Sequence, residues 1–390
     1  MRAIFSGSFD PITVAHLDII KRAAKSFKTV IVNVGKNSEK TPLFSVEKRV
    51  ELIKEAIKDW PERQNIMIIS ESGLTVDVAM AYDANVLIRG IRPGTNDLEN
   101  ENKLAVMNQY LAKIRGFKLE TKFYNSNDVF SANISSTAVK NLFELRQYIA
   151  AARCVPANVH EAMCELYLRE LWLTLFKTEV DALYHWKDLL KAYRGRPYHN
   201  LSHIAYMLNM LQIYLSQNSH CADFSNHKEL VLAIFMHDYV YNTDHGDNSS
   251  IARMEVNDNG RMPLPYSNEM ASAGVIFDMR NDLVDTISVE LARGLVMATS
   301  HSGDRLNNDY ALIADLDLSV LGTFERRVWK NYNTAIRKEY AVYPDEIYIP
   351  ERKKVLERFA ESNQIFHTSF FYNNFEEQAR KNLEYELSNL

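Results

Sequence analysis

The sequence predicts an α/β domain built on a doubly wound parallel sheet, followed by an all-α domain. In the first half, short apolar runs alternate with helical patterns, which indicates parallel strands joined by helices. In the second half, the hydrophobic periodicity is helical throughout. A chain of 390 residues is also too long for one ordinary core. We therefore expect two domains, residues 1–167 and 168–390.

The composition is that of a globular protein without a strong charge bias. Hydrophobic residues make up 46% of the chain, and the net charge is −5. This mild balance predicts no general attraction to nucleic acid or to a membrane surface. The chain opens on an apolar run without a targeting pattern, and no run nears the roughly 18 apolar residues of a membrane span. We expect a cytoplasmic protein whose cysteines, Cys154, Cys164 and Cys221, are free thiols.

Five short apolar runs of the first half are typical of buried strands in a Rossmann-like sheet. They are residues 2–6, 29–35, 65–70, 85–89 and 118–124. The helical patterns between them include residues 46–58, 74–82 and 96–115. In such a sheet, ligands bind at the carboxyl ends of the strands. We therefore expect functional residues to follow directly after the strands.

The stretch from Ser6 to Phe27 combines a strand end, a glycine turn and the start of a helix. Gly7 allows a tight turn and a close approach to a ligand. Thr13 is a suitable N-cap, and the apolar residues after it recur at helical spacing. His16 then lies beside the unpaired N–H groups and the positive end of the helix dipole. The pattern predicts a phosphate site, although a histidine that only decorates a helix end fits the same residues.

Polar and basic residues follow the other strands as well. They include Lys36 and Lys40 after the second strand, and Arg89, Gly90 and Arg92 after the fourth. The segment 133–137 follows the fifth strand. A serine there would cap a further helix and add a second ring of N–H groups. The sequence has no GxxxxGK[ST] motif, so this is not a P-loop site.

The motifs GSFDPIT..HLDII, KTPLF, LIRGIR..NDLENENKLAVMN, ISSTAVK and VPANVHEAM occur in this order. Together they resemble the phosphopantetheine adenylyltransferases of the nucleotidyltransferase superfamily, over residues 1 to about 167. The resemblance implies transfer of adenylyl from ATP to 4′-phosphopantetheine with Mg²⁺, giving dephospho-CoA and pyrophosphate. RGIR with the acidic and MN elements separates this family from its nicotinate and cytidylyl relatives.

The resemblance also implies a role for individual positions. His16 and Ser8 would hold the transferring phosphate, and the cations Lys40 and Arg89 would neutralise it and its nucleophile. The triphosphate would be held by Ser135, Ser136 and Thr137. Further implied contacts to ATP or substrate are Phe9, Leu74, Thr75, Gly90, Arg92, Asp97 and Glu101.

Two positions depart from the family pattern. The glycine that precedes the motif histidine is Ala15 here, which adds a methyl group where a ligand comes close. The segment between Arg92 and Asp97 is one residue longer than in the family. Because either change would alter substrate preference or rate, a different phosphorylated acceptor is an alternative. For the cationic positions the other interpretation is a solvated surface charge.

The second half is predicted to be helical from its start to residue 390. The helical patterns are residues 201–215, 229–237, 267–277, 283–300, 311–321, 324–341, 351–360 and 375–387. No strand alternation is evident. An all-α domain of about 220 residues is the expectation.

Four short segments of this half carry imidazoles and carboxylates: residues 198–203, 235–238, 300–301 and 315–317. These side chains are ligands for divalent Mn, Fe, Zn or Mg. His237 and Asp238 end an apolar helix, where burial forces polar groups to pair. A lone His-Asp pair is more often a capped helix end. The order H…HD…D on successive helices, however, predicts a metal centre.

That order resembles the HD phosphohydrolase superfamily. The fuller pattern resembles its predicted metal-dependent hydrolases over roughly residues 171–390: YHNLSH, FMHDYVYN..HGDN, ATSH, DLDLSVLG, KEY at 338–340 and FHT at 366–368. The resemblance implies hydrolysis of a phosphoester or phosphoanhydride. It implies the metal ligands His203, His237, Asp238 and Asp317.

Four more residues belong to this predicted site with less definite roles. Asp315 is the alternative to Asp317 as the last ligand. His199 and His301 would be additional ligands or phosphate contacts, and for His199 a core hydrogen bond is an equal alternative. Asp247 would orient water or substrate.

The leading hypothesis is therefore a bifunctional enzyme, an adenylyltransferase of coenzyme A biosynthesis fused to an HD hydrolase. One rival keeps nucleotidyl transfer but shifts the acceptor. Another makes the HD domain a metal- or ligand-binding regulatory module. Family members of the first half form homo-hexamers, so a homo-oligomer is also expected.

Overall fold

The computed structural model describes residues 1–35, 41–91, 97–125, 134–218, 224–243, 267–301 and 308–390. The chain divides into two compact units, Met1–Met163 and Cys164–Leu390. This division falls inside helix α8 (Ala157–Leu173), four residues before the boundary predicted after residue 167. Within the described ranges, no helix is long and apolar enough to cross a membrane.

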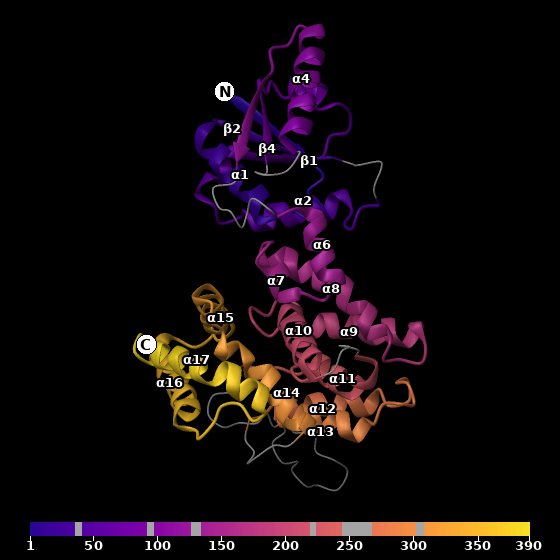
Figure 1. The fold of residues 1–390 in the computed structure, drawn as a ribbon, viewed down its shortest axis with the longest axis vertical. Coiled ribbons are helices and arrows are strands. Elements are labelled where there is room, and N and C mark those ends of the chain that lie inside the picture. Colours follow the sequence, from indigo (N-terminus) through magenta and orange to yellow (C-terminus); the bar gives the residue numbers. More distant parts are fainter. Residues whose placement is uncertain (36–40, 92–96, 126–133, 219–223, 244–266, 302–307) are drawn as a thin grey trace. The chain divides into compact units, whose positions relative to one another are not determined.

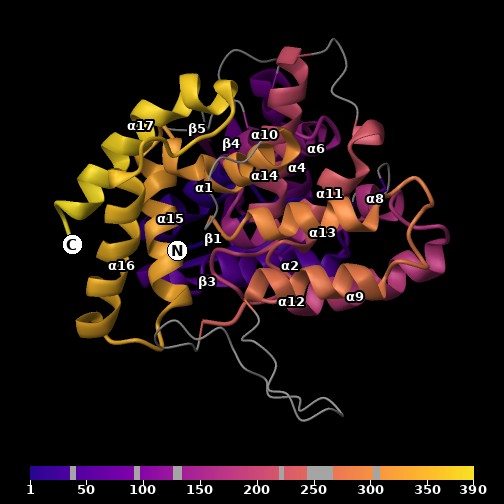
Figure 2. The same cartoon turned by 90° about the horizontal axis from the view of Figure 1, so that it is seen from below.

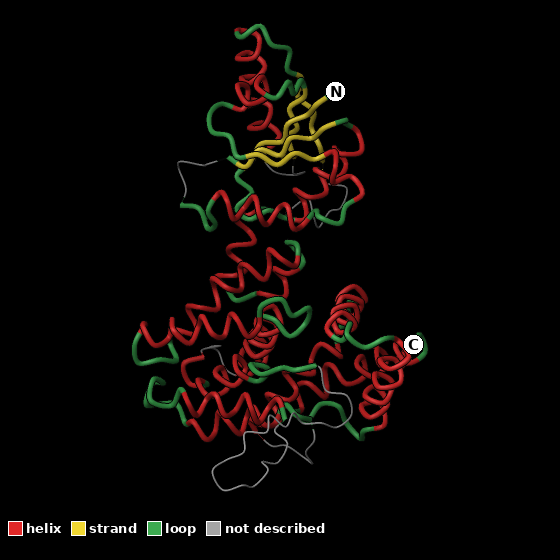
Figure 3. Tube along the Cα trace, turned by 180° about the vertical axis from the view of Figure 1, so that it is seen from behind, coloured by secondary structure: helices red, strands yellow, loops and turns green. Residues whose placement is uncertain are grey.

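The N-terminal unit is organised around a parallel sheet with the strand order β3-β2-β1-β4-β5 (Figure 1; Figure 3). The strands are β1 (Arg2–Gly7), β2 (Thr29–Val34), β3 (Ile66–Ile69), β4 (Val86–Ile91) and β5 (Glu120–Asn125). Most residues of β1 and β2 are buried whichever face they point to, which explains their apolar sequence. The predicted doubly wound sheet is confirmed.

Helices cover both faces of this sheet. Ile4, Ile31 and Leu87 of the strands pack against α3 and α4 on one face. Phe5 points to the other face, because side chains alternate along a strand, and its ring contacts His16 of α1. The helical elements are α1 (Val14–Ser26), α2 (Val46–Ala56), η1 (Pro61–Asn65), α3 (Thr75–Ala81), α4 (Asp97–Ile114), α6 (Ser136–Glu144), α7 (Tyr148–Ala152) and the first part of α8.

The strand order reverses between β1 and β4, which pair with each other. From β1 the sheet grows through β2 and β3 on one side, and from β4 through β5 on the other. The loops that leave the two strands therefore diverge and open a crevice at their carboxyl ends. The ends concerned are Gly7 of β1 and Ile91 of β4.

The described residues of the C-terminal unit form helices and connecting loops, as predicted. Phe176 and Leu283 form an isolated β-bridge between two loops. At the centre of the unit lies α11 (Lys228–Met236), which is buried from Leu230 onwards and contacts α10, α12, α13 and α14 (Figure 2). The other elements are α9 (Glu179–Tyr193), α10 (Leu201–Asn218), η2 (Phe224–Asn226), α12 (Asn268–Asp278), α13 (Val289–Ala298), α14 (Asn308–Leu318), η3 (Ser319–Gly322), α15 (Arg326–Glu339), α16 (Asp345–Glu361) and α17 (Ser369–Leu387).

Two helices begin six residues earlier than predicted. α16 begins at Asp345 instead of residue 351 and keeps Pro350 inside it. The proline costs the helix one backbone hydrogen bond, while the acidic residues at 345 and 346 favour the earlier start through the helix dipole. α17 begins at Ser369 instead of residue 375, because Thr368 caps it by accepting from the N–H of Phe371 at 3.4 Å.

One helix begins six residues later than predicted. α13 starts at Val289 instead of residue 283, and Ser288 caps it by accepting from the N–H of Leu291 at 3.3 Å. Of the three cysteines, Cys154 and Cys164 are buried free thiols, and Cys221 lies outside the described residues.

His160 of α8 makes the stability of the N-terminal unit depend on pH. The residue is 5% exposed, and its Nε2 lies 3.0 Å from the carbonyl oxygen of Tyr148. Burial lowers its pKa to about 4, against the opposing effect of that hydrogen bond. The unfolded chain binds this proton near pH 6.5, so the stability is complete above about pH 6.5 and falls as the pH drops towards 4, by about 3 kcal/mol.

We expect His160→Gln to remove this slope. Urea unfolding of the wild type and the variant should diverge at neutral pH and converge near pH 4.5. His227→Gln, on a half-buried histidine of the other compact unit, serves as the control. An unchanged pH slope in His160→Gln would contradict the prediction.

Candidate active sites

A cavity of about 330 Å³ opens where β1 and β4 end, at the switch point of the sheet. Its walls come from the turn after β1, the first turns of α1, the end of β4, one residue of α4 and the start of α6. The predicted site residues that line it are Ser8, Phe9, His16, Arg89, Gly90, Glu101, Ser135, Ser136 and Thr137. The structure thus brings together predicted residues from both ends of the unit.

His16 is the third residue of α1 and helps to cap it. Its Nδ1 accepts a hydrogen bond from the backbone N–H of Thr13 at 3.1 Å. Its ring stands edge-on to the ring of Phe9, with centroids 5.2 Å apart. Because Nδ1 accepts, the neutral imidazole carries its proton on Nε2. The ring can therefore donate a hydrogen bond to an oxygen atom in the cavity that it lines.

The start of α6 forms another wall of the cavity. Ser135 is the N-cap, and its Oγ accepts from the N–H of Ala138 at 3.0 Å, as the sequence predicted. The hydroxyl of Ser136 donates to the carbonyl oxygen of Pro11 at 2.7 Å. This bond joins α6 to the segment that leads into α1. Two helix N-termini, each favourable for an anion, therefore border one cavity.

Arg89, which was predicted to neutralise the phosphate and its nucleophile, is paired with a carboxylate in the structure. Its guanidinium is paired with the carboxylate of Glu101, and the two side chains are 19% and 21% exposed. The pairing joins two residues for which separate roles were expected. At the neighbouring Gly90, a larger residue would require the side chain of Ile19 to move, because a Cβ there would lie 2.7 Å from Cδ1 of Ile19. The wall of the cavity is therefore closely packed at this point.

Two buried charged residues that the sequence did not single out hold the cavity in shape. Asp10 accepts from the backbone N–H groups of Leu43 and Phe44, at 2.8 and 3.0 Å. Arg49 is 2% exposed and donates to the carbonyl oxygens of Ser8 and Gly35, at 2.5 and 3.0 Å. The sequence does hold a signal for the structural role of Asp10, because a charged residue stands next to a proline within the GSFDPIT motif.

Several predicted contacts are not placed at this cavity. Lys40 and Arg92 lie outside the described residues, and Asp97 begins α4 but its side chain is not described. Leu74 and Thr75 lie at the start of α3 and do not line the cavity. The side chain of Leu74 is 49% exposed.

A second cluster lies in the C-terminal unit, where His203 of α10, His237 at the end of α11 and Asp317 of α14 converge. One ligand atom from each lies within 4.8 Å of the other two. The Nε2 atoms of the histidines are 3.3 Å apart, and Oδ1 of Asp317 lies 3.1 Å from His203 and 3.8 Å from His237. Nδ1 of His237 lies 2.9 Å from the carbonyl oxygen of Ile234. A proton on that nitrogen leaves Nε2 as the metal-binding atom.

Three more predicted residues border this cluster. Asp238 Oδ2 lies 2.9 Å from Nε2 of His237, and Nε2 of His301 lies 2.9 Å from Asp317 Oδ2. His199 is farther away, with its Nε2 3.9 Å from Asp238 Oδ2. Its Nδ1 is paired with Glu339 at 2.5 Å, a contact that was not predicted.

Asp315, the predicted alternative ligand, is not in the cluster. It is fully buried, and its two oxygens accept from the N–H groups of His367 and Thr368 at 2.8 and 2.7 Å. Its carboxylate thus satisfies the start of α17. The alternation of Asp315 and Asp317 along a helix explains this, because residues two apart face different directions. Asp247 lies outside the described residues.

The charged groups of the cluster shift one another's pKa values. Burial lowers the pKa of His237, but Asp238 and Asp317 outweigh it and raise that pKa to about 9. Burial raises the pKa of Asp238, but His237 and His199 outweigh it and lower that pKa to about 2. The carboxylates therefore favour a positive charge beside them. A divalent cation would meet the same demand, so the donor set fits a metal.

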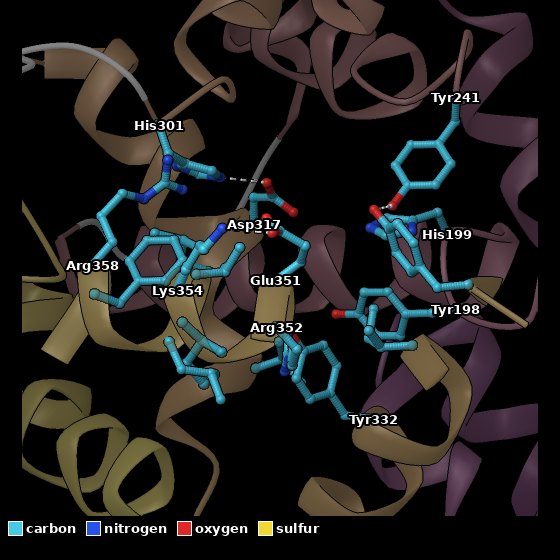
Figure 4. Close-up of a pocket in the computed structure, with 18 of the residues that line it drawn as sticks. Tyr198, His199, Tyr241, His301, Asp317, Tyr332, Glu351, Arg352, Lys354 and Arg358 are labelled. Atoms are coloured by element: carbon cyan, nitrogen blue, oxygen red, sulfur yellow. Dashed lines mark hydrogen bonds and ion pairs between the residues drawn. The ribbon is translucent and has the colours of Figure 1, made fainter. Parts of the chain in front are cut away.

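A cavity of about 690 Å³ adjoins these residues (Figure 4). His199, Asp238, His301 and Asp317 line it, together with a group of tyrosines and one side of α16. A volume of this size accommodates a small organic molecule. The cluster is therefore open to a substrate.

Comparison with known proteins bears on the first site. Residues 4–142 match the cytidylyltransferase-like family. The chain is similar to the lipopolysaccharide core biosynthesis protein of Thermoplasma volcanium GSS1, with 18% identity over 33% of this chain and 98% of that one, and a TM-score of 0.26. For the nicotinic acid mononucleotide adenylyltransferase of Plasmodium falciparum complexed with NaAD, the identity is 16%, the coverage 43% and 96%, and the TM-score 0.33.

The family match runs from β1 into α6 and contains the cavity at the switch point. The N-terminal unit is therefore a nucleotidyltransferase-like domain.

Proposed function

We propose that the N-terminal unit transfers the adenylyl group of ATP to 4′-phosphopantetheine, giving dephospho-CoA and pyrophosphate. The observation that carries nucleotidyl transfer is the placement of His16 and the starts of α1 and α6 around one cavity. N–H groups at helix starts bind phosphate oxygens. The choice of acceptor rests on the RGIR, acidic and MN motifs.

The reaction needs in-line placement of the nucleophile and positive charge on the developing oxyanions. In this proposal, the Nε2–H of His16 donates to an oxygen of the transferring phosphate. Ser136 and Thr137 at the start of α6 hold the pyrophosphate that leaves. Arg89 keeps part of its contact with Glu101 and donates its other N–H groups to the phosphate of the acceptor. Mg²⁺ bound with ATP would offset the charge of the triphosphate.

Mass spectrometry of the products tests the acceptor. The full chain is incubated with ATP, Mg²⁺ and either 4′-phosphopantetheine or nicotinic acid mononucleotide. Dephospho-CoA and pyrophosphate are the expected products of the first mixture. If the second mixture gives a dinucleotide and the first gives no product, the acceptor is nicotinic acid mononucleotide and the proposal of 4′-phosphopantetheine is wrong.

Ala15 lines the cavity one residue before His16. We expect Ala15→Gly to keep or raise kcat/KM for 4′-phosphopantetheine, because it removes a methyl group where the substrate approaches. The cost in stability should be about 1 kcal/mol or less, measured by thermal unfolding. Loss of turnover in a folded Ala15→Gly variant would show that the methyl group is a required contact.

For the C-terminal unit we propose hydrolysis of a phosphoester or phosphoanhydride. His203, His237, Asp238 and Asp317 would hold a divalent metal, which lowers the pKa of its water and offsets phosphate charge. The convergence of three ligand atoms beside a large cavity carries this proposal. His301, whose Nε2 lies 2.9 Å from Oδ2 of Asp317, would contact the phosphate in this proposal.

Metal analysis combined with a hydrolysis screen tests this second activity. The purified chain is loaded with Mn²⁺, Zn²⁺, Mg²⁺ or Fe²⁺ and offered a panel of phosphate esters and anhydrides. A chain that binds metal tightly but hydrolyses none of them would favour the regulatory alternative, in which the HD-like unit senses a ligand.

A further inference from the structure

The cavity of the C-terminal unit has walls of different chemistry (Figure 4). One wall carries the proposed metal ligands Asp238 and Asp317. Another is formed by the side chains of Tyr198, Tyr241, Tyr332, Tyr340, Tyr343 and Tyr348. A third is the side of α16 that includes Lys354 and Arg358, one turn apart. A ligand that fills this cavity meets all three.

Most of the charge on α16 is already neutralised. Arg352 pairs with the carboxylate of Glu386, with its Nε 2.8 Å from Oε1. Lys354 pairs with Glu351 at 2.6 Å. Arg358 differs, because within the described ranges its guanidinium has no ion pair and lies over the ring of Phe359, 5.2 Å from its centroid. It is therefore a cation of this wall that is available for an anion.

Arg358 lies on the side of the cavity that holds the metal ligands. The adjacent Phe359 places its ring 6.2 Å from the ring of His301, and His301 in turn contacts Asp317. Figure 4 shows the guanidinium of Arg358 extended towards His301. An anion bound by Arg358 would therefore be close to the cluster.

We propose that Arg358 binds the phosphate group of the substrate, and that the substrate is a terminal phosphate on an aromatic or apolar group. This inference rests on the proposed hydrolase function. A guanidinium binds two phosphate oxygens side by side. A terminal phosphate has a third non-bridging oxygen that would face the metal held by Asp238 and Asp317, whereas a phosphodiester has only two non-bridging oxygens in all. The tyrosines supply the surface for the organic part.

The reaction is a simple hydrolysis. The oxygen of water forms a bond to phosphorus while the bond from phosphorus to the ester oxygen breaks. One proton of the water ends on the alcohol that leaves, and inorganic phosphate is the other product. No oxidant or further reactant is needed.

The test uses the full chain loaded with Mn²⁺, with 4-nitrophenyl phosphate as the monoester and bis(4-nitrophenyl) phosphate as the diester. Arg358→Gln should raise KM for the monoester about 10- to 100-fold, with a smaller change in kcat. Arg358→Lys should recover part of the loss. Lys353→Gln removes a charge from the same helix outside this cavity and should leave KM unchanged.

Binding of inorganic phosphate, followed by calorimetry, separates this inference from the hydrolase proposal. If no ester is hydrolysed but phosphate binds Arg358→Gln at least tenfold more weakly than the wild type, the subsite stands and the hydrolase proposal fails. If esters are hydrolysed and Arg358→Gln matches the wild type in KM and phosphate affinity, the subsite is wrong. Absence of phosphate binding to the wild type, or equal use of the diester, also overturns the inference.

Discussion

Replacing His16 by alanine is expected to lower kcat for adenylyl transfer by about 10²- to 10³-fold, because one hydrogen bond to the charge that develops in a transition state typically contributes about 3–4 kcal/mol. KM for ATP should change much less. Single-turnover formation of dephospho-CoA by rapid quench measures the effect on chemistry alone. Near-normal kcat in this variant would remove His16 from the mechanism.

A second variant separates catalysis from the structural role of the same side chain. Because Nδ1 of His16 accepts from the N–H of Thr13, alanine also removes a helix cap, at a cost of about 1 kcal/mol. His16→Asn places an amide oxygen near the position of Nδ1 and nothing at Nε2. It should therefore keep the thermal stability of the wild type and lose kcat as alanine does. If His16→Asn keeps the kcat of the wild type, the loss of kcat in His16→Ala comes from the missing helix cap.

The second large effect is expected for Asp238→Asn. The amide keeps the size of the carboxylate but is a weaker metal ligand, so bound metal and hydrolysis should both fall sharply, by about 10-fold or more in affinity. Adenylyl transfer should persist, because its residues lie in the other compact unit. Metal content and both activities are measured on one preparation. Asp285→Asn, on a carboxylate that is 89% exposed, is the matched control.

Loss of both activities in a folded Asp238→Asn protein would contradict the independence of the two sites. It would favour the regulatory interpretation, in which the metal state of the C-terminal unit changes the activity of the first by a coupling free energy. A thermal melt that matches the wild type must accompany that result. The comparison with Asp285→Asn removes effects of charge alone.

Features set by neighbouring residues were predictable from the sequence. The cap at Thr13 and the first-turn position of His16 depend on a few adjacent residues, and the structure confirms both. The cap at Ser135 is of the same kind. The strand pattern followed from apolar runs that are too short for a buried helix and that alternate with longer helical patterns.

Pairings between distant residues could not be predicted in the same way. The contact of Arg89 with Glu101 and the buried bonds of Arg49 depend on how loops return to the sheet edge. Asp315 and Asp317 are the same residue type two positions apart, and only the packing of the segment before α17 decides which one accepts from its N–H groups. The early start of α16 was missed because Pro350 is usually a helix breaker, and here the surrounding helix accommodates it.

The hydrogen bond from Ser136 to Pro11 has a consequence for the entropy of the proposed nucleotide binding. It links the start of α6 to the segment before α1, while Arg49 holds the turn at Ser8 from the other side. These groups therefore lose their conformational entropy when the chain folds. Little further entropy is lost when a triphosphate binds. Association should then be fast and close to rigid-body, with the free and nucleotide-bound backbones nearly superimposable at this edge of the sheet.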